Sequence, residues 1–268
     1  MEQVGAIIAV ASGKGGVGKS TTAVNLAFAL QHLGLRIGLL DADIYGPSVA
    51  MMLGVSEGTK PKTHERQYFY PIEVGGIKTM SMGYLVTERT PMVWRGPMAG
   101  GALTQMLEQT LWGELDILLV DMPPGTGDIQ LTLSQKAKLA GAVIVTTPQD
   151  IALLDAKKAI EMFNKVAVPV LGLVENMSVH ICSACGHQEP IFGHLGGAKM
   201  AEDYNVPLLG SLPLTLAIRE SGDQGLPVVM SHPSSKESVL YIEAAEAMLR
   251  ALNKTETPSA PTVQFSDE

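Results

Sequence analysis

One stretch near the N-terminus limits the possible folds of this chain more than any other. Residues 13–21 read Gly-Lys-Gly-Gly-Val-Gly-Lys-Ser-Thr, which fits the pattern G-x-x-x-x-G-K-[ST]. An apolar run of strand length, residues 6–10, precedes the pattern, and a helix-length segment, residues 22–33, follows it. A strand, a glycine-rich turn and a helix in this order predict a phosphate-binding loop. The alternative, a glycine-rich turn that matches by chance, is disfavoured by a second nucleotide signature further along the chain.

Each residue type in this loop has a physical reason. Glycines adopt backbone conformations that strain other residues, so successive N–H groups can turn inward and form a concave anion site. The helix that follows adds unpaired N–H groups and the positive end of its dipole. Lys19 is placed to reach the β- and γ-phosphates of ATP, and the Ser20 hydroxyl is placed to ligate Mg²⁺. The predicted nucleotide contacts are Gly13, Lys14, Gly15, Gly16, Val17, Gly18, Lys19, Ser20 and Thr21.

Lys14 is the unusual residue of the loop, because one lysine is enough for an ordinary phosphate-binding loop. With K-G-G-x-G-K-[ST], the chain resembles the deviant P-loop ATPases. This group contains the septum-site and plasmid-partition ATPases, nitrogenase iron protein and the Mrp/ApbC iron–sulfur carriers. In that group the first lysine crosses a two-fold dimer interface to the partner's nucleotide, much as an arginine finger does. The resemblance therefore implies a homodimer and a catalytic role for both Lys14 and Lys19.

The rest of the chain predicts an α/β fold. Apolar runs of strand length alternate with helix-length segments nearly to the end of the chain. Runs without polar alternation indicate strands that are covered on both faces, as in a mostly parallel sheet with helices on both sides. With 46% hydrophobic residues, the chain can bury one full core. We expect a single P-loop ATPase domain over residues 1–252, with a helix ending at Leu252, and a disordered polar tail over residues 253–268.

Composition limits the partners. The formal charge of −8 argues against sequence-independent binding of nucleic acid or of an anionic membrane, both of which need a basic surface. No apolar run reaches the roughly 18 residues that suggest a membrane span, and the first apolar run is too short for a signal peptide. We therefore expect a cytoplasmic protein with no nucleic-acid or membrane partner, although a removed organellar presequence would leave no trace here.

Two acidic segments end predicted strands beside the phosphate-binding loop. Residues 41–48 read D-A-D-I-Y-G-P-S, and residues 116–121 form an apolar strand that ends in Asp121. Carboxylates in these places can hold Mg²⁺ or orient the attacking water. For Asp41, a structural role as a helix cap is an equally good interpretation. Asp121 is predicted to lie near the Mg²⁺ shell.

The sequences of both segments are similar to those of the Mrp/ApbC members in particular. In those proteins the second aspartate of the first segment positions the attacking water, which implies a catalytic role for Asp43 and a place near Mg²⁺. The second segment continues as D-M-P-P-G-T-G-D over residues 121–128, where two prolines stiffen and two glycines loosen the backbone. Such a segment can be held by a γ-phosphate and released on hydrolysis.

The remaining predicted contacts depend on the resemblance. It implies that Asn176 contacts adenine, although an asparagine after a strand is more often a turn former. Pro213 is expected on the other side of the base pocket. Trp94 and Arg95 would face a partner, although a packed tryptophan and a solvated arginine are the common alternative. Between these elements, residues 59–66 are expected to form a mobile loop, and residues 68–81 a hairpin or an addition to a sheet edge.

The chain has two cysteines, Cys182 and Cys185, in a C-x-x-C spacing. Half of a zinc ribbon is one interpretation, but the chain has no second C-x-x-C pair. A redox pair would need a helix N-terminus to lower the thiol pKa, and no helix is predicted at Cys182. Two copies related by a two-fold axis would supply the four thiolates of a [4Fe–4S] cluster. The resemblance favours the last interpretation, because Mrp/ApbC proteins hold a labile cluster between two subunits with such a pair.

The sequence thus predicts a dimeric ATPase that uses ATP and Mg²⁺, carries a [4Fe–4S] cluster and delivers it to apo iron–sulfur proteins. Two alternatives stay open. One is a spatial-organisation switch like the septum-site and plasmid-partition ATPases, without a cluster. The other is a dimeric ATPase whose cysteines are bridged by zinc.

Overall fold

The computed structural model describes residues 3–65, 67–85 and 96–256, and a central sheet runs through them. Its strands are β1 (Val4–Ala11), β2 (Ile37–Asp41), β5 (Ile72–Val74), β6 (Ile77–Ser81), β7 (Leu115–Asp121), β8 (Gly141–Thr146), β9 (Val170–Glu175) and β12 (Leu208–Ser211). The eight strands follow the order β12-β9-β8-β1-β7-β2-β6-β5, and all neighbours pair in parallel except β5 with β6. The predicted α/β class is confirmed.

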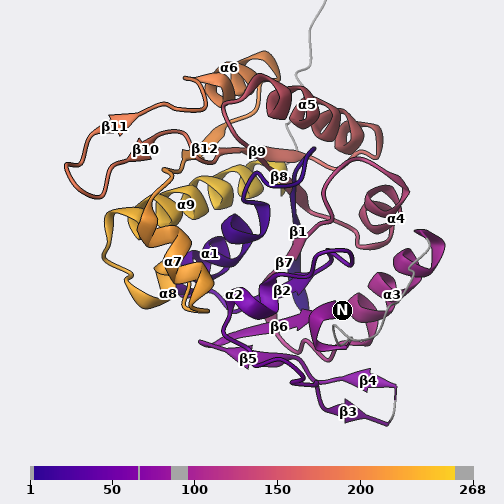
Figure 1. Ribbon diagram of the computed structural model, residues 1–268. Coiled ribbons are helices and arrows are strands. Elements are labelled where there is room, and N and C mark those ends of the chain that lie inside the picture. Colours follow the sequence, from indigo (N-terminus) through magenta and orange to yellow (C-terminus); the bar gives the residue numbers. More distant parts are fainter. Residues whose placement is uncertain (1–2, 66, 86–95, 257–268) are drawn as a thin grey trace, which may run out of the picture.

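Helices cover both faces of the sheet (Figure 1). They are α1 (Lys19–His32), α2 (Val49–Met52), α3 (Gly96–Gln109), α4 (Asp128–Lys136), α5 (Asp150–Lys165), α6 (Gly196–Asp203), α7 (Leu216–Asp223), α8 (Val228–Ser231) and α9 (Lys236–Glu256), with the 3₁₀ turn η1 at Met82–Tyr84. Side chains alternate across β1, so that Ile8 and Val10 join a core with α1 and α9, while Ile7 and Ala9 join a core with α3 and α5. Both faces are therefore buried, which explains the absence of polar alternation in the strands.

Between residues 59 and 85, the predicted mobile loop is in part a strand, and the predicted hairpin is present. Part of the expected loop forms the short strand β3 (Thr63–His64), which pairs antiparallel with β4 (Tyr68–Phe69). The prediction missed β3 because its backbone N–H and C=O groups pair with those of β4, whereas in a loop they would bond to water. The expected hairpin is present in β5 and β6, joined by Gly75 and Gly76 in the left-handed region of the backbone map.

The C-terminal helix is longer than predicted. The prediction ended this helix at Leu252, whereas α9 continues through Asn253 to Glu256. The Thr255 hydroxyl donates a hydrogen bond to the carbonyl of Leu252, and Lys254 lies in the last turn, where a cation favours the helix dipole. The hydrogen bond and the lysine both favour a helix that continues into the expected tail. The rest of that tail, residues 257–268, lies outside the described part of the chain. Trp94 and Arg95 also lie outside the described residues.

The parallel strands end at one edge of the sheet, and the loops that follow them carry the predicted site residues. The phosphate-binding loop follows β1, Asp43 follows β2, residues 122–128 follow β7, and Asn176 follows β9. Right-handed crossovers place such loops side by side, where ligands of open α/β sheets bind. No helix in the described residues is both long and apolar enough to cross a bilayer.

Candidate functional site

The glycine-rich turn between β1 and α1 has the backbone that the sequence predicts. Gly16 and Gly18 have φ values of 82° and 83°, in the left-handed region. A Cβ atom on Gly18 would lie 2.1 Å from the side-chain nitrogen of Asn176. Position 18 therefore requires glycine for two reasons, the left-handed backbone conformation and the close approach of the Asn176 side chain.

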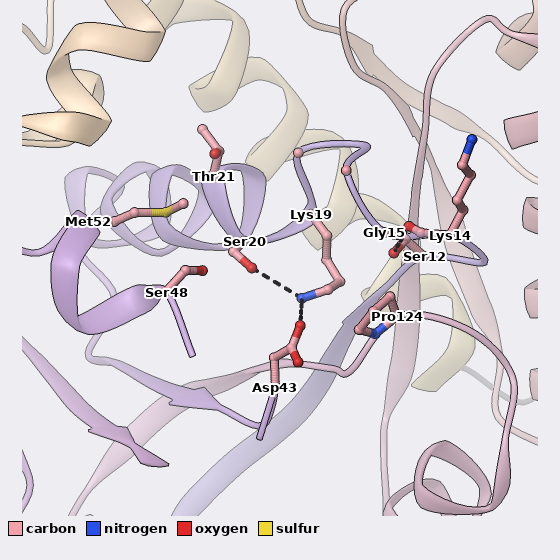
Figure 2. Close-up of a pocket in the computed structure, with 12 residues that line it drawn as sticks. Ser12, Lys14, Gly15, Lys19, Ser20, Thr21, Asp43, Ser48, Met52 and Pro124 are labelled. Carbon is pink, nitrogen blue, oxygen red and sulfur yellow. Dashed lines mark hydrogen bonds and ion pairs between the residues drawn. The ribbon is translucent and has the colours of Figure 1, made fainter. Parts of the chain in front are cut away.

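The turn encloses a cavity of about 190 Å³ at the N-terminus of α1 (Figure 2). Its lining combines the phosphate-binding loop with residues from the loops after β2 and β7. The lining residues are Ser12, Lys14, Gly15, Gly16, Gly18, Lys19, Ser20, Thr21, Asp43, Ser48, Met52 and Pro124. The structure thus brings Lys19, Ser20 and Asp43 together around the N-terminus of α1, a position where helices can bind anions.

Lys19 is buried and paired with carboxylates. Its Nζ atom lies 2.5 Å from Oδ1 of Asp121, 3.2 Å from Oγ of Ser20 and 3.9 Å from Oδ2 of Asp43. Figure 2 shows the Lys19 side chain reaching toward Ser20 and Asp43 across the cavity floor. Lys19 therefore contacts both carboxylates that the sequence analysis predicted, and its charge offsets part of the cost of burying them.

The same oxygens fit a hard cation. Asp121 is fully buried, and none of the residues that the structure describes donates a hydrogen bond to its Oδ2 atom, which is therefore an unsatisfied acceptor. Burial raises the pKa of Asp121, while the Lys19 charge opposes that rise. A hydroxyl from Ser20 and carboxylates from Asp43 and Asp121 are the kind of ligands that Mg²⁺ takes, directly or through water.

Asp41 lies beneath this cavity and is fully buried at the end of β2. Its Oδ2 atom accepts hydrogen bonds from the Val49 N–H at 3.2 Å and from the Ser81 hydroxyl at 2.9 Å. Burial, followed by the charge of Asp121, raises the pKa of Asp41 to about 7. Because Val49 is the first residue of α2, Asp41 caps that helix from a distance, which supports the structural interpretation of this aspartate.

Lys14 differs from Lys19 in its burial and in its ion pairs. It is exposed, and Figure 2 shows its side chain extending away from the Lys19 ammonium. No acidic side chain among the described residues forms an ion pair with it. The Lys14 side chain is therefore exposed to solvent at the rim of the cavity that its residue helps to line.

Asn176 links the phosphate-binding loop to a second cavity. Its side-chain nitrogen donates a hydrogen bond of 2.8 Å to the carbonyl of Val17. Asn176 also lines a cavity of about 170 Å³ together with Pro213, so the two residues predicted to contact the base lie in one cavity. Sequence reasoning missed the other residues of this cavity, which come largely from α2 and α7. They are Met51, Met52, Met177, Leu214, Thr215, Ile218, Arg219, Gly222 and Asp223, whereas Gly18 and Thr21, which also line the cavity, were among the predicted nucleotide contacts.

The segment after Asp121 is fastened at two points. The Gly125 N–H donates to the carbonyl of Ser12 at 2.9 Å, and Gln130 Nε2 donates to the carbonyls of Pro123 and Pro124 at 3.3 and 2.7 Å. Gln130 is buried near the start of α4, and nothing in the sequence pattern singled it out. The segment thus lies against the phosphate-binding loop and shares the cavity wall through Pro124.

The two cysteines lie in the turn of a small hairpin. Strands β10 (His180–Ile181) and β11 (Gln188–Glu189) pair antiparallel, and the turn between them is closed by hydrogen bonds from Cys182 N–H to His187 O and from Gly186 N–H to Cys182 O. Both thiols are free, with Cys182 half-buried and Cys185 exposed. The N–H groups of Ala184 and Cys185 stabilise the Cys182 thiolate and lower its pKa.

No single copy of the described chain completes a metal site around these thiols. Among the described residues, no three His, Cys, Asp or Glu side chains gather at one point. No helix begins at Cys182 either, so the helix N-terminus of a thioredoxin-like pair is missing there, and the lowered pKa of Cys182 comes from the N–H groups of the turn instead. The hairpin offers two soft ligands to a metal, and the other ligands have to come from elsewhere.

Comparison with known proteins identifies the group to which the chain is related. Residues 3–249 match the family described as ParA: NUBPL iron-transfer P-loop NTPase. The chain belongs to this family. One similar member is the iron–sulfur cluster carrier protein of Pseudomonas fragi, which is 60% identical over 92% of this chain and 86% of its own length.

Solved structures agree with this assignment to the NUBPL-type NTPases. A nucleotide-binding protein from Archaeoglobus fulgidus, in complex with ADP, has a TM-score of 0.76 and 36% identity, covering 89% of this chain and 92% of its own. The cell division ATPase MinD of Pyrococcus furiosus has a TM-score of 0.67 and 25% identity, covering 92% and 99%. The predicted resemblance to iron–sulfur carriers within the deviant P-loop group is confirmed.

The fold of this NUBPL-type NTPase relates its two chemical features to each other. The phosphate-binding loop follows the carboxyl end of β1, and the cysteine hairpin lies beyond Asn176, which follows the carboxyl end of β9. Both therefore belong to the same edge of the sheet. Asn176 connects them, because it contacts the Val17 carbonyl and lies a few residues before the hairpin.

Proposed function

We propose that two copies of this chain bind Mg·ATP, hold a [4Fe–4S] cluster between them and pass the cluster to apo iron–sulfur proteins. The observation that carries the proposal is the pair of free thiols at Cys182 and Cys185, on the nucleotide edge of the sheet and without further ligands among the described residues. The family supports a role in iron transfer. The free thiols support a reducing, cytoplasmic setting.

The nucleotide part of the proposal depends on the cavity at the N-terminus of α1. The triphosphate would lie in the glycine-rich turn, where inward N–H groups and Lys19 neutralise its charge. Ser20, Asp43 and Asp121 would hold Mg²⁺, which supplies further neutralisation of the developing charge on the phosphates. Asp43 faces the cavity from the loop after β2 and is the residue we assign to orienting the attacking water.

The base would lie in the cavity lined by Asn176 and Pro213. An asparagine amide both donates and accepts, so it suits the edge of adenine. The three methionines at positions 51, 52 and 177 give this cavity an adaptable apolar wall. ADP in the related Archaeoglobus fulgidus protein supports an adenine nucleotide here.

The dimer is supported by two groups that lack a function in a single copy. Lys14 is exposed and points away from the Lys19 ammonium, so its charge is available to a partner's phosphates. The thiols at positions 182 and 185 supply half of the four ligands that a [4Fe–4S] cluster takes. A two-fold axis between two copies would complete both sites at once.

The cluster is the cargo of this protein, and the hairpin suits a cargo that must leave. Cys185 is exposed, and the hairpin is joined to the segment after β12 by contacts such as the Ile181 N–H donating to the carbonyl of Leu214. Exposed thiolate ligands leave a cluster open to attack by the thiols of a recipient protein. A buried cage would protect the cluster but would hinder its transfer.

The proposal is tested by anaerobic reconstitution with iron and sulfide. We expect the wild-type chain to gain visible charge-transfer absorption, with about four iron atoms per dimer, and to restore an apo-[4Fe–4S] enzyme. Cys182→Ala and Cys185→Ala should lose the absorption and keep ATP binding, whereas Ser183→Ala, in the same turn, should change neither. A colourless dimer containing zinc would favour the zinc-bridged alternative, and a protein with neither metal would favour the spatial-organisation switch.

A further inference from the structure

The fully buried Asp41 connects three segments that meet at the nucleotide cavity. Its Oδ1 atom accepts the N–H of Asp43 at 3.1 Å, and its Oδ2 atom accepts the N–H of Val49 at 3.2 Å and the hydroxyl of Ser81 at 2.9 Å. A buried carboxylate is costly unless donors surround it, so three donors around one carboxylate indicate a tight, specific arrangement. Asp41 itself does not line the cavity.

The first two donors lie at opposite ends of one loop. Asp43 begins the loop after β2, and Val49 begins α2, while Ser48 between them lines the cavity. The two oxygens of Asp41 therefore hold both ends of the loop that presents Asp43 and Ser48 to the phosphates. The Asp43 carboxylate also accepts the Gly46 N–H at 3.3 Å, which makes this loop a compact turn.

The third donor extends the network to the neighbouring strand. Ser81 ends β6 in register with Asp41, and its hydroxyl oxygen accepts the N–H of Gly83 at 3.0 Å. The hydroxyl thus caps η1, which packs on α2. A displacement of the loop at Asp43 would therefore also displace η1, because the Asp41 carboxylate is hydrogen-bonded to both Asp43 and Ser81.

We propose that Asp41 is a positioning residue for ATP hydrolysis, which holds Asp43 and Ser48 against the phosphates and connects them through Ser81 to η1. This inference rests on the proposed ATPase activity. Asp41 acts through the loop, because it is fully buried and does not line the cavity. Its loss should therefore lower kcat more than it changes the affinity for ATP.

Two variants test this role. Asp41→Asn keeps the shape of the side chain but has one acceptor oxygen in place of two, so the N–H of Asp43 or of Val49 loses its partner. We expect kcat to fall about tenfold with KM within about twofold of wild type. Ser81→Ala keeps both backbone contacts and should lower kcat only about threefold. Ser238→Ala is the matched control, because its hydroxyl is equally buried and donates to the carbonyls of Val228 and His232.

Hydrogen–deuterium exchange with ADP bound provides a readout that does not depend on hydrolysis. Asp41→Asn should accelerate exchange in a peptide covering residues 42–53 and leave residues 19–32 of α1 unchanged, whereas Ser238→Ala should not accelerate residues 42–53. Unchanged exchange and kcat in Asp41→Asn would overturn the inference, as would an equal fall in kcat with Ser238→Ala. If Asp41→Asn does not fold, Ser81→Ala decides. If the wild-type chain hydrolyses no ATP, the proposed function fails, and the exchange data alone decide the role of Asp41.

Discussion

The Nζ atom of Lys19 lies 2.5 Å from Oδ1 of Asp121, and both side chains are buried. The two residues are 102 positions apart in the chain, and they meet because β1 and β7 are parallel neighbours. The lysine that the motif assigns to phosphates is thus paired with the carboxylate assigned to the Mg²⁺ shell. Mg·ATP would give each of these charges a partner of opposite sign, so we expect nucleotide binding to compete with this ion pair.

This ion pair predicts a stability effect. Lys19→Met should destabilise the nucleotide-free protein by about 3 kcal/mol, because it leaves Asp121 buried without its cation. Adding Asp121→Asn removes that charge, and the double variant should regain more than half of the loss. Urea unfolding without nucleotide, above neutral pH, measures both variants. Equal stability of the single and double variants would show that the pair contributes little.

Lys14 should matter for turnover and not for binding. Its side chain is exposed and points away from the Lys19 ammonium, so Lys14→Ala should leave ATP affinity within about twofold and lower kcat about 1,000-fold, the low end of what an arginine finger contributes. Isothermal titration and a phosphate-release assay measure the two quantities. Lys165→Ala, at the exposed C-terminal end of α5, is a matched control that removes one surface lysine. A turnover of Lys14→Ala equal to that of the control would refute a role across the dimer.

Two glycines of the turn should respond differently to the same substitution. Gly16→Ala places a methyl group in open space and suffers only the left-handed conformation, about 1–2 kcal/mol. Gly18→Ala suffers the same strain and in addition pushes against Asn176, whose nitrogen would lie 2.1 Å from the new Cβ. We therefore expect a greater loss of thermal stability and of ATP binding in Gly18→Ala. Equal losses would mean that Asn176 yields without cost.

The pKa of Cys182 predicts how fast the thiol reacts at different pH values. N–H groups of Ala184 and Cys185 stabilise the thiolate, so the folded pKa lies below the ordinary value of 9.0. Alkylation of metal-free Cys185→Ser, which has one thiol, should therefore reach half its limiting rate at a lower pH when folded than in urea. Unfolding removes the donors, and the midpoint should then rise. An equal or higher alkylation midpoint in the folded protein would argue against stabilisation of the Cys182 thiolate by these two N–H groups.

Much of the site could be predicted because the chemistry of a phosphate-binding loop is local. The strand, the turn and the helix that form it are consecutive in the chain, and the conformations of Gly16 and Gly18 follow from glycine itself. The expected hairpin at Gly75 and Gly76 was predictable for the same reason. In contrast, Met51 and Gln130 carry no local pattern, and they reach the site only through the packing of α2 and α4.

By itself, the sequence determined the fold class, the phosphate-binding loop and the presence of two thiols in one short turn, because each depends on residues close together in the chain. Only the tertiary structure decided that Asp121 pairs with Lys19 and that Asp41 holds the ends of the loop around Asp43. Such pairings depend on strand order, and strand order is set by which apolar faces pack together over the whole chain. Identical carboxylates at the ends of β2 and β7 therefore have different partners, for reasons that no short segment contains.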